Sequence, residues 1–278
     1  MRSLSLAACL SLSLLAPAWA QTATTPIHLA PHRAVYDLSL LRSGGTKGVE
    51  SARGRIAMEF GGDACEGYTV KYRQVTVLDS SDAGSRTLDT QSATFETGDG
   101  LSMRFKTTST VQGLVRDGVD GDAQLRPDGS LDVRFKQPRD DTFSATGQPL
   151  FPTEHMKRLI EMARKGERTY SARVYDGSDD GKKVFETLSL IGNRIEPGAG
   201  EGVEEPARQE ALAKMPRWPM TISYFEEGKA DREPAYTISF ELYENGIARA
   251  LKINYGEFAL KGDLKSLEIP AVTSACQR

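Results

Sequence analysis

The amino-acid sequence predicts an all-β protein in which a single long antiparallel sheet closes, or nearly closes, on itself with one main helix packed against it. Three observations support this prediction. Apolar and polar residues alternate in short segments along most of the chain, which is typical of strands with one buried face. The links between these segments are too short for helical crossovers, so neighbouring strands run antiparallel. Only one segment places its apolar residues at clear helical spacing.

About a dozen segments qualify as strands. They are 32–40, 51–60, 68–78, 101–105, 122–126, 131–135, 169–175, 182–191, a strand beginning at Arg217, 236–243, 247–255 and 263–269. Asn245-Gly246 between two of them is a strong hairpin signal. Near Arg73-Gln74 the apolar positions shift by one residue, and we expect a β-bulge there. A sheet of this length tends to curl, which brings its first and last strands together.

The segment that follows Pro152-Thr153 and runs to Lys165 is the one clear helix. Its apolar residues from Met156 to Ala163 fall at helical spacing. Thr153 can cap the first turn, and Gly166 suits the position just after the last turn. The apolar stripe is wide enough to plug or cover a sheet. A second, short helix is expected over 207–214.

Residues 1–20 have the layout of a signal peptide. A basic start at Arg2 is followed by an apolar run over 4–15 and by an A-x-A cleavage motif ending at Ala20. The run is shorter than the about 20 residues that a membrane-spanning helix needs, and no later segment approaches that length. We therefore predict export, one domain over 21–278 and no transmembrane segment.

The composition excludes several classes of partner. The part of the chain after the predicted signal peptide has 34 basic and 38 acidic residues, spread along its length. It has no broad basic face for nucleic acid and no polybasic anchor for anionic lipid. We therefore expect no nucleic-acid partner.

Two of the three cysteines, Cys65 and Cys276, remain after export. Cys9 lies inside the predicted signal peptide; it also ends a short lipoprotein-like box, but a cut there would leave the apolar run on the mature chain. In an oxidising compartment we predict a structural Cys65–Cys276 disulfide. Two buried free thiols are the alternative, and a catalytic pair would normally have C-x-x-C spacing. Because Cys65 follows the second strand, this bond requires the first and last strands to meet.

Residues 176–181 resemble the first half of a calcium-binding loop, with acidic or hydroxyl side chains at alternate positions. The match then fails, because Thr187 stands where such loops have Glu and because Lys182 and Lys183 place positive charge inside the site. A hairpin turn explains the same residues.

The sequence contains no G-x-S-x-G, H-E-x-x-H or C-x-x-C motif. His28 and His32 are separated by Pro31, which prevents a helical metal-binding pair. His155, beside Glu154, is the best candidate for a general base, although a lone histidine in this position is more often a packing residue. We predict a non-enzymatic protein with no catalytic residue, no metal site and no cofactor.

Several segments together resemble the EipB family of periplasmic cell-envelope integrity proteins. They are His-Arg-Ala-Val-Tyr-Asp-Leu at 32–38, Phe-Pro-Thr-Glu-His at 151–155, Tyr-Asp-Gly-Ser at 175–178 with Gly181, Arg-Trp-Pro at 217–219 with Ser-Tyr-Phe at 223–225, and the two cysteines. No single segment is diagnostic, but their order and spacing extend over nearly all of the chain after the signal peptide. Tyr175 departs from the pattern, which has a plainer aromatic there.

The resemblance implies an open, spiral-like β-barrel with the helix in its concavity, and an internal disulfide. It also implies a periplasmic location in a Gram-negative cell, a role in envelope integrity and a periplasmic tetratricopeptide-repeat protein as partner. The family has no established catalytic residues, so only Cys65 and Cys276 carry over.

Three functions follow as hypotheses. The first is an interaction protein that supports envelope integrity. The second is a carrier of a hydrophobic ligand such as a lipid, because a curled sheet with an apolar concave face can hold one, although the early G-x-W of lipocalin-like barrels is missing. The third is an envelope hydrolase without a known motif, with His155 as its best candidate residue.

Overall fold

The computed structural model describes residues 26–44, 48–82, 84–228 and 233–271. The predicted signal peptide, Cys9 and Cys276 lie outside these ranges. The signal peptide and the Cys65–Cys276 bond therefore stay predictions.

The strands of the described chain form one antiparallel sheet. They are β1 (His32–Ser43), β2 (Val49–Asp63), β3 (Gly67–Ser80), β4 (Gly84–Glu96), β5 (Ser102–Val111), β6 (Leu114–Leu125), β7 (Leu131–Gln137), β8 (Asp141–Ala145), β9 (Thr169–Val174), β10 (Phe185–Ile191), β11 (Arg217–Glu226), β12 (Tyr236–Tyr243), β13 (Ala248–Asn254) and β14 (Phe258–Glu268). The helical elements are α1 (Pro152–Arg164), the 3-10 turn η1 (Glu205–Arg208) and α2 (Glu210–Ala213). The predicted fold class, a long antiparallel sheet with one main helix, is confirmed.

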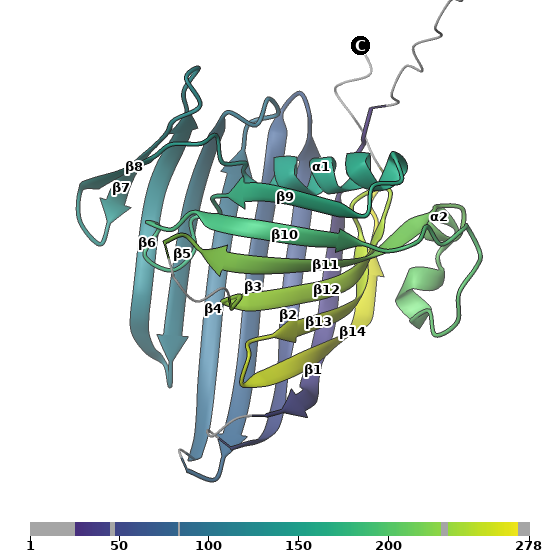
Figure 1. The fold of residues 1–278 in the computed structure, drawn as a ribbon. Coiled ribbons are helices and arrows are strands. Elements are labelled where there is room, and N and C mark those ends of the chain that lie inside the picture. The colour runs from purple at the N-terminus through teal and green to yellow at the C-terminus, as the bar shows by residue number, and fades with distance from the viewer. Residues whose placement is uncertain (1–25, 45–47, 83, 229–232, 272–278) are drawn as a thin grey trace, which may run out of the picture.

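The two edge strands of the sheet, β8 and β9, come from the middle of the chain, whereas the first and last strands, β1 and β14, are neighbours inside it. Its order is β8-β7-β6-β5-β4-β3-β2-β1-β14-β13-β12-β11-β10-β9. The first and last strands pair directly, as predicted, with Arg33 opposite Glu268. In Figure 1 the shorter strands β9–β13 cross in front of the long strands of the other half. The sheet thus folds over on itself and encloses an interior between its two halves.

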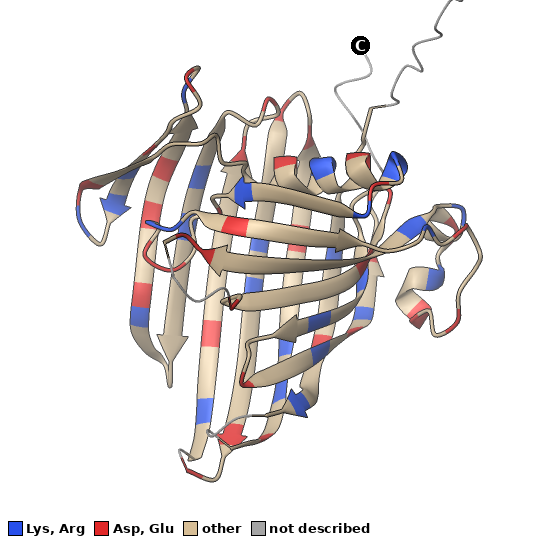
Figure 2. Ribbon diagram, in the orientation of Figure 1, with Lys and Arg blue, Asp and Glu red and all other residues tan. Residues whose placement is uncertain are grey.

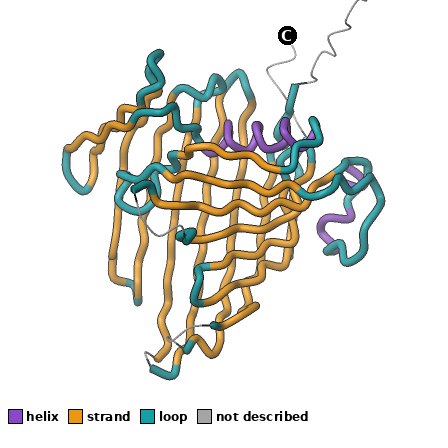
Figure 3. Tube along the Cα trace, viewed as in Figure 1, coloured by secondary structure: helices purple, strands orange, loops and turns teal. Residues whose placement is uncertain are grey.

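The segment between β8 and α1 contacts β9, the other edge strand of the sheet, at one point. Leu150, just before α1, donates its N–H to the carbonyl of Arg173 at 2.8 Å and accepts the N–H of Tyr175 at 3.0 Å. The helix then begins beside β9, and Figure 3 shows it lying along this strand at one end of the two layers. This short bridge places α1 at the opening of the sheet.

The bulge predicted at Arg73-Gln74 is wrong. β3 pairs with β2 and with β4 without interruption through these residues. The inward positions change from apolar to polar at Gln74 and Thr76, whereas Val75 lies on the opposite face. The shift of apolar residues therefore marks a change in what the strand faces and not an extra residue.

Helix α1 is confirmed, but the cap predicted for Thr153 is wrong. Phe151 precedes the first turn, and its side chain makes no capping hydrogen bond. Thr153 is buried and bonds instead to Glu96 of β4. At the other end Gly166 has a φ of +78° and donates its N–H to Ala163 at 3.1 Å, as expected of a residue that ends a helix.

Three clusters of buried side chains hold the two halves together. One packs Ile160 of α1 against Trp218 of β11 and residues of β2 and β3. A second surrounds Phe105 and Tyr175 over β5–β7. The third joins β1, β13 and β14 to η1 and α2 through Leu212. The expected second helix over 207–214 is thus two short turns that pack against the sheet.

The acidic loop over 176–181 is a hairpin turn between β9 and β10, as the sequence predicts. Its glycines allow it to lie directly on the core. Gly177 and Gly181 have φ values of +68° and +73°, and a Cβ on either would lie 2.6 Å from the ring of Phe105 or Phe135. Tyr175 completes the turn by donating its hydroxyl to the carbonyl of Gly181 at 2.8 Å.

Candidate functional site

A cavity of about 790 Å³ lies between the two halves of the sheet. Its volume falls in the range of roughly 300–1,000 Å³ that small-molecule sites occupy. One wall comes from β3, β4 and β5, and the other from β10, β12, β13 and β14. The apolar part of the lining consists of Val70, Tyr72, Leu78, Leu88, Phe185, Tyr236, Ile238, Ile253, Tyr255, Phe258 and Leu260.

The wall on β3–β5 is rich in hydroxyl groups. Its polar residues are Gln74, Thr76, Thr90, Ser92, Thr94 and Thr107. Several bond to one another: Thr107 donates to Ser92 at 3.2 Å, and the Gln74 amide donates to Thr76 at 3.1 Å. The cavity is therefore amphipathic, with its hydroxyl and amide groups concentrated on the β3–β5 wall.

Aromatic side chains gather at one end of the cavity. Tyr236 and Phe185 line it, and Tyr224 lies behind them. The Tyr224 and Tyr236 rings stack with centroids 4.5 Å apart, and Phe185 meets both rings edge-on at 5.9 and 6.0 Å. Burial raises the pKa of both tyrosines, so their hydroxyls stay neutral.

One carboxyl group at this end is not balanced by a base. Asp176 lines the cavity, and its Oδ1 accepts the N–H of Ser178 at 2.9 Å. Burial raises the pKa of Asp176. The neighbouring Asp179 and Glu226 share the ammonium of Lys183, at 2.8 and 3.2 Å. None of the described residues that line the cavity is Lys, Arg or His.

A second buried carboxyl, that of Glu96, holds the helix. Its oxygens accept the backbone N–H of Thr153 at 3.0 and 3.1 Å and the Thr153 hydroxyl at 2.9 Å. Burial raises the pKa of Glu96 to about 7, against the opposing effect of these hydrogen bonds. The end of β4 therefore supplies the cap that α1 lacks in its own sequence.

His155 is placed as a packing residue. Its ring is buried and stacks on Tyr170 at a centroid distance of 6.0 Å. Burial lowers its pKa to about 4, so the ring is neutral at pH 7. It does not line the cavity between the two halves of the sheet. Within the described ranges, no cluster of His, Cys, Asp and Glu is suited to a metal, and no helix is long and apolar enough to cross a bilayer.

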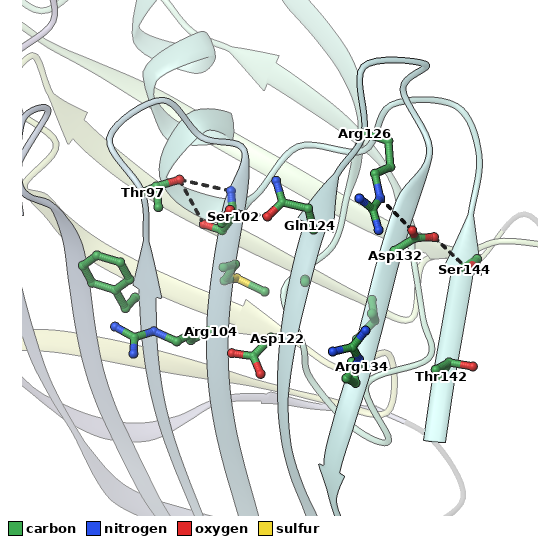
Figure 4. Close-up of a pocket in the computed structure, with 14 residues that line it drawn as sticks. Thr97, Ser102, Arg104, Asp122, Gln124, Arg126, Asp132, Arg134, Thr142 and Ser144 are labelled. Atoms are coloured by element: carbon green, nitrogen blue, oxygen red, sulfur yellow. Dashed lines mark hydrogen bonds and ion pairs between the residues drawn. The ribbon is translucent and has the colours of Figure 1, made fainter. Parts of the chain in front are cut away.

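The outer surface of β4–β8 carries a ladder of alternating charges, which we call the charged face. Arg104, Asp122 and Arg134 lie opposite one another on β5, β6 and β7. Figure 4 shows them in one row, with Gln124, Asp132 and Ser144 in the next and Arg126 beyond it. The ion pair between Arg126 and Asp132 is 2.8 Å long.

The outer surface of β9–β12 differs, and we call it the leucine face. It consists of Thr169, Ser171, Leu188, Leu190, Thr221, Ser223, Thr237 and Ser239, which the strand register places in two rows. Leu188 and Leu190 are 40% and 51% exposed. Figure 2 shows these strands almost without charge along their middle parts, whereas the long strands behind them carry many charged residues.

Of the two predicted disulfide residues, the structure places one. Cys65 lies in the exposed turn after β2, where its N–H bonds to Asp63 at 2.8 Å. β14 ends on the same side of the sheet, since Glu268 lies opposite Arg33 and Arg33 lies opposite Glu59. The ends of β2 and β14 are thus separated only by β1. The predicted Cys65–Cys276 disulfide therefore does not require the edge strands β8 and β9 to meet.

The comparisons with known proteins agree with this architecture. A model of the family described as EipB-like matches residues 23–271. The chain belongs to this family. It is 37% identical over 253 residues to the cell envelope integrity protein EipB of Brucella abortus, an alignment that covers 91% of this chain and 88% of that protein.

The EipB-like fold is also known from a solved structure. The crystal structure of a β-barrel-like protein of a domain of unknown function from Brucella abortus superposes with a TM-score of 0.81. The two chains are 36% identical, and the match covers 88% of this chain and all of that one. The family resemblance seen in the sequence and the β-barrel-like architecture are therefore both confirmed.

The sequence interpretation missed Glu96 and Asp176 as functional candidates. Glu96 lies 57 residues before Thr153, its partner, and no local pattern connects them. Asp176 was considered as part of a calcium-binding loop and then assigned to a hairpin turn. One signal was available for the cavity: hydroxyl and amide residues recur at the inward positions of β3 and β4, where a packed core would have apolar ones.

Proposed function

We propose that this protein supports the integrity of the cell envelope by binding another protein of the periplasm, without catalysing a reaction. The likeness to the EipB protein of Brucella abortus over 91% of the chain supports the envelope role. The predicted signal peptide and the predicted disulfide support the periplasmic location. The partner that we propose is a periplasmic tetratricopeptide-repeat protein, as the family resemblance implies.

The leucine face is the observation that supports protein binding. Leu188 and Leu190 expose large apolar side chains in the centre of an uncharged area of Ser and Thr. The centres of protein interfaces are depleted in charged residues, and exposed apolar patches of this kind mark interaction sites. On the charged face, by contrast, a partner would have to displace water from many ionised groups.

The test is complementation of a deletion strain with a charged version of this face. We expect L188E/L190E to fold normally, because exposed substitutions usually change stability by less than about 0.5 kcal/mol, and to fail to restore resistance to detergents and cell-wall antibiotics. The matched control is L114E/V115E on the β5–β6 hairpin, where the two side chains are 76% and 70% exposed. Full complementation by L188E/L190E, or failure of only the control, contradicts the proposal.

A second function, the binding of a hydrophobic ligand such as a lipid, is favoured by the cavity between the two halves of the sheet. Its volume suits a small molecule, and one of its walls is largely apolar. Native mass spectrometry of protein purified from the periplasm tests it. A bound species released on unfolding is expected, and protein free of any ligand in repeated preparations contradicts this second function.

A further inference from the structure

The cavity has a charge pattern that restricts its ligand. We propose that it binds an amphiphile with a single apolar chain and a cationic ammonium head, the head lying beside Asp176 and Tyr236 and the chain along β12–β14. This inference rests on the second proposed function, the binding of a hydrophobic ligand. It goes beyond that function by naming the class of ligand and the place of its head group.

The first argument is the charge of the lining. Asp176, Asp179 and Glu226 are the ionisable acids among the residues that line the cavity, and no described base lines it. Lys183 pairs with Asp179 and Glu226. A carboxylate or phosphate head would find no cation in the lining to pair with and would face these acids at close range. An anionic head group in this cavity would therefore be repelled and unpaired.

The second argument is the surroundings of Asp176. The side chain is partly exposed, and the surface it exposes lines the cavity. Its carboxyl accepts the backbone N–H of Ser178 at 2.9 Å and also bonds to the Ser178 side chain. Because burial disfavours its charged form, this carboxylate gains more from a cation than a solvated one would. An ammonium group is the partner that would satisfy it.

The third argument is the aromatic group next to this carboxyl. The Tyr224 and Tyr236 rings stack at 4.5 Å, with Phe185 edge-on to both. The negative charge of Asp176 contributes to the raised pKa of both tyrosines, which places it near their hydroxyls. Aromatic faces together with a carboxylate form the type of site that binds ammonium groups through cation–π contacts.

The fourth argument is the apolar wall that continues from this end. Ile238, Ile253 and Leu260 line the cavity beyond Tyr236, on β12, β13 and β14. The strand register places Ile238 opposite Ile253 and Ile253 opposite Leu260, so the three form one row across neighbouring strands. A single alkyl chain can lie along this row while its head stays beside Asp176.

The experiment compares three probes with the same chain on the full mature protein. Decyltrimethylammonium, decyl glucoside and decanoate are titrated below their micelle concentrations, and binding is followed by calorimetry. Tetramethylammonium tests the head without a chain. We expect the ammonium probe to bind about tenfold more tightly than decanoate, a ratio that cation–π and charge attraction without a hydrogen bond can supply, with the glucoside between them and tetramethylammonium too weak to detect.

Asp176→Asn is the variant that locates the head group. It should remove most of the preference for the ammonium probe and leave the affinity for decyl glucoside unchanged. Asp120→Asn on the charged face is the control and should change neither. If Asp176→Asn does not fold, the order of the three probes on the wild-type protein still decides the question.

The outcomes separate this inference from the function on which it rests. Equal affinities for the three chains, or tightest binding of decanoate, overturn the cationic head and leave hydrophobic binding in place. If tetramethylammonium binds as tightly as decyltrimethylammonium, the part of the inference that requires an apolar chain is overturned. The absence of binding of all three chains to folded protein overturns both the inference and the second proposed function.

Discussion

The two halves of the sheet use their charged residues in opposite ways. On β4–β8 the charges lie on the outer surface in exposed cross-strand rows, as Arg104, Asp122 and Arg134 do. In the β9–β14 half one group of charges is buried, around Arg217 and Arg249, each about 3% exposed. The outer surface of β9–β12 is left almost without charge along its middle.

The buried group has a clear structural task. Arg249 donates to Glu204 at 2.5 Å and to the carbonyl of Gly202 at 2.7 Å, and it also contacts Glu241. Arg217 donates to the same Glu241 at 2.6 Å. These contacts fix the segment before η1 to β12 and β13. The charges of one half thus lie on an exposed surface, whereas this group in the other half secures a chain segment, and the leucine face carries none of them.

The largest effect on stability is expected from breaking the buried group. Arg249→Met leaves two partly buried carboxylates, those of Glu204 and Glu241, without one of their cations. Removal of one partner from a buried ion pair costs about 3–5 kcal/mol. Urea denaturation measures the free energy of unfolding, with Lys136→Met on the charged face as the control. A loss below about 1 kcal/mol would show that the group is not the anchor described here.

The next effect concerns Glu96, a buried acid at the end of β4. Its pKa is about 7 in the folded chain, against an ordinary value of 4.5. The folded chain therefore binds the Glu96 proton more tightly than the unfolded chain does. The protonated carboxyl contributes its full stabilisation below about pH 4.5, and this contribution is lost as the pH rises through 7. The loss is on the order of 3 kcal/mol.

Glu96→Gln keeps an acceptor for Thr153 but cannot ionise. Its free energy of unfolding should therefore fall less than that of the wild type between pH 4.5 and pH 8. Denaturation curves at several pH values give this difference, with the exposed Glu59→Gln as the control. Parallel pH profiles for Glu96→Gln and the wild type would show that Glu96 is already ionised at low pH.

The smallest effect is expected on the charged face. Asp122 pairs with Lys136 at 2.6 Å, and the two side chains are 41% and 55% exposed. Pairs this exposed contribute about 0–1 kcal/mol and are screened by salt. A double-mutant cycle of Asp122→Asn and Lys136→Met should give a coupling energy in this range. A coupling above about 2 kcal/mol would remove the contrast between the two halves.

The sequence predicted the parts of the fold that have local signals. The Asn245-Gly246 hairpin and α1 with Gly166 at its end are confirmed, because each depends on residues close together in the chain. β4 and β8 were not predicted. β4 carries Thr90, Ser92 and Thr94 on its inward face, so the apolar alternation that identifies a strand is missing.

The errors have the same physical origin as the cavity. The inward face of a strand that borders a cavity needs no large apolar residues. At Gln74 a polar residue therefore faces inward, and this break in the apolar alternation was mistaken for a β-bulge. The capping of α1 by Glu96 and the approach of Asp176 to Tyr236 depend on contacts across the folded sheet. Such contacts leave no periodic trace in one sequence.

The central claim, that the leucine face binds a protein partner, is tested most directly by crosslinking in living cells. A photoreactive amino acid is placed at Leu190 in one strain and at Arg104 on the charged face in another, both positions being exposed. We predict a specific adduct from Leu190, with a tetratricopeptide-repeat protein identified in it, and none from Arg104. An adduct from Arg104 alone, or no adduct from Leu190 in cells that the variant fully complements, would contradict the claim.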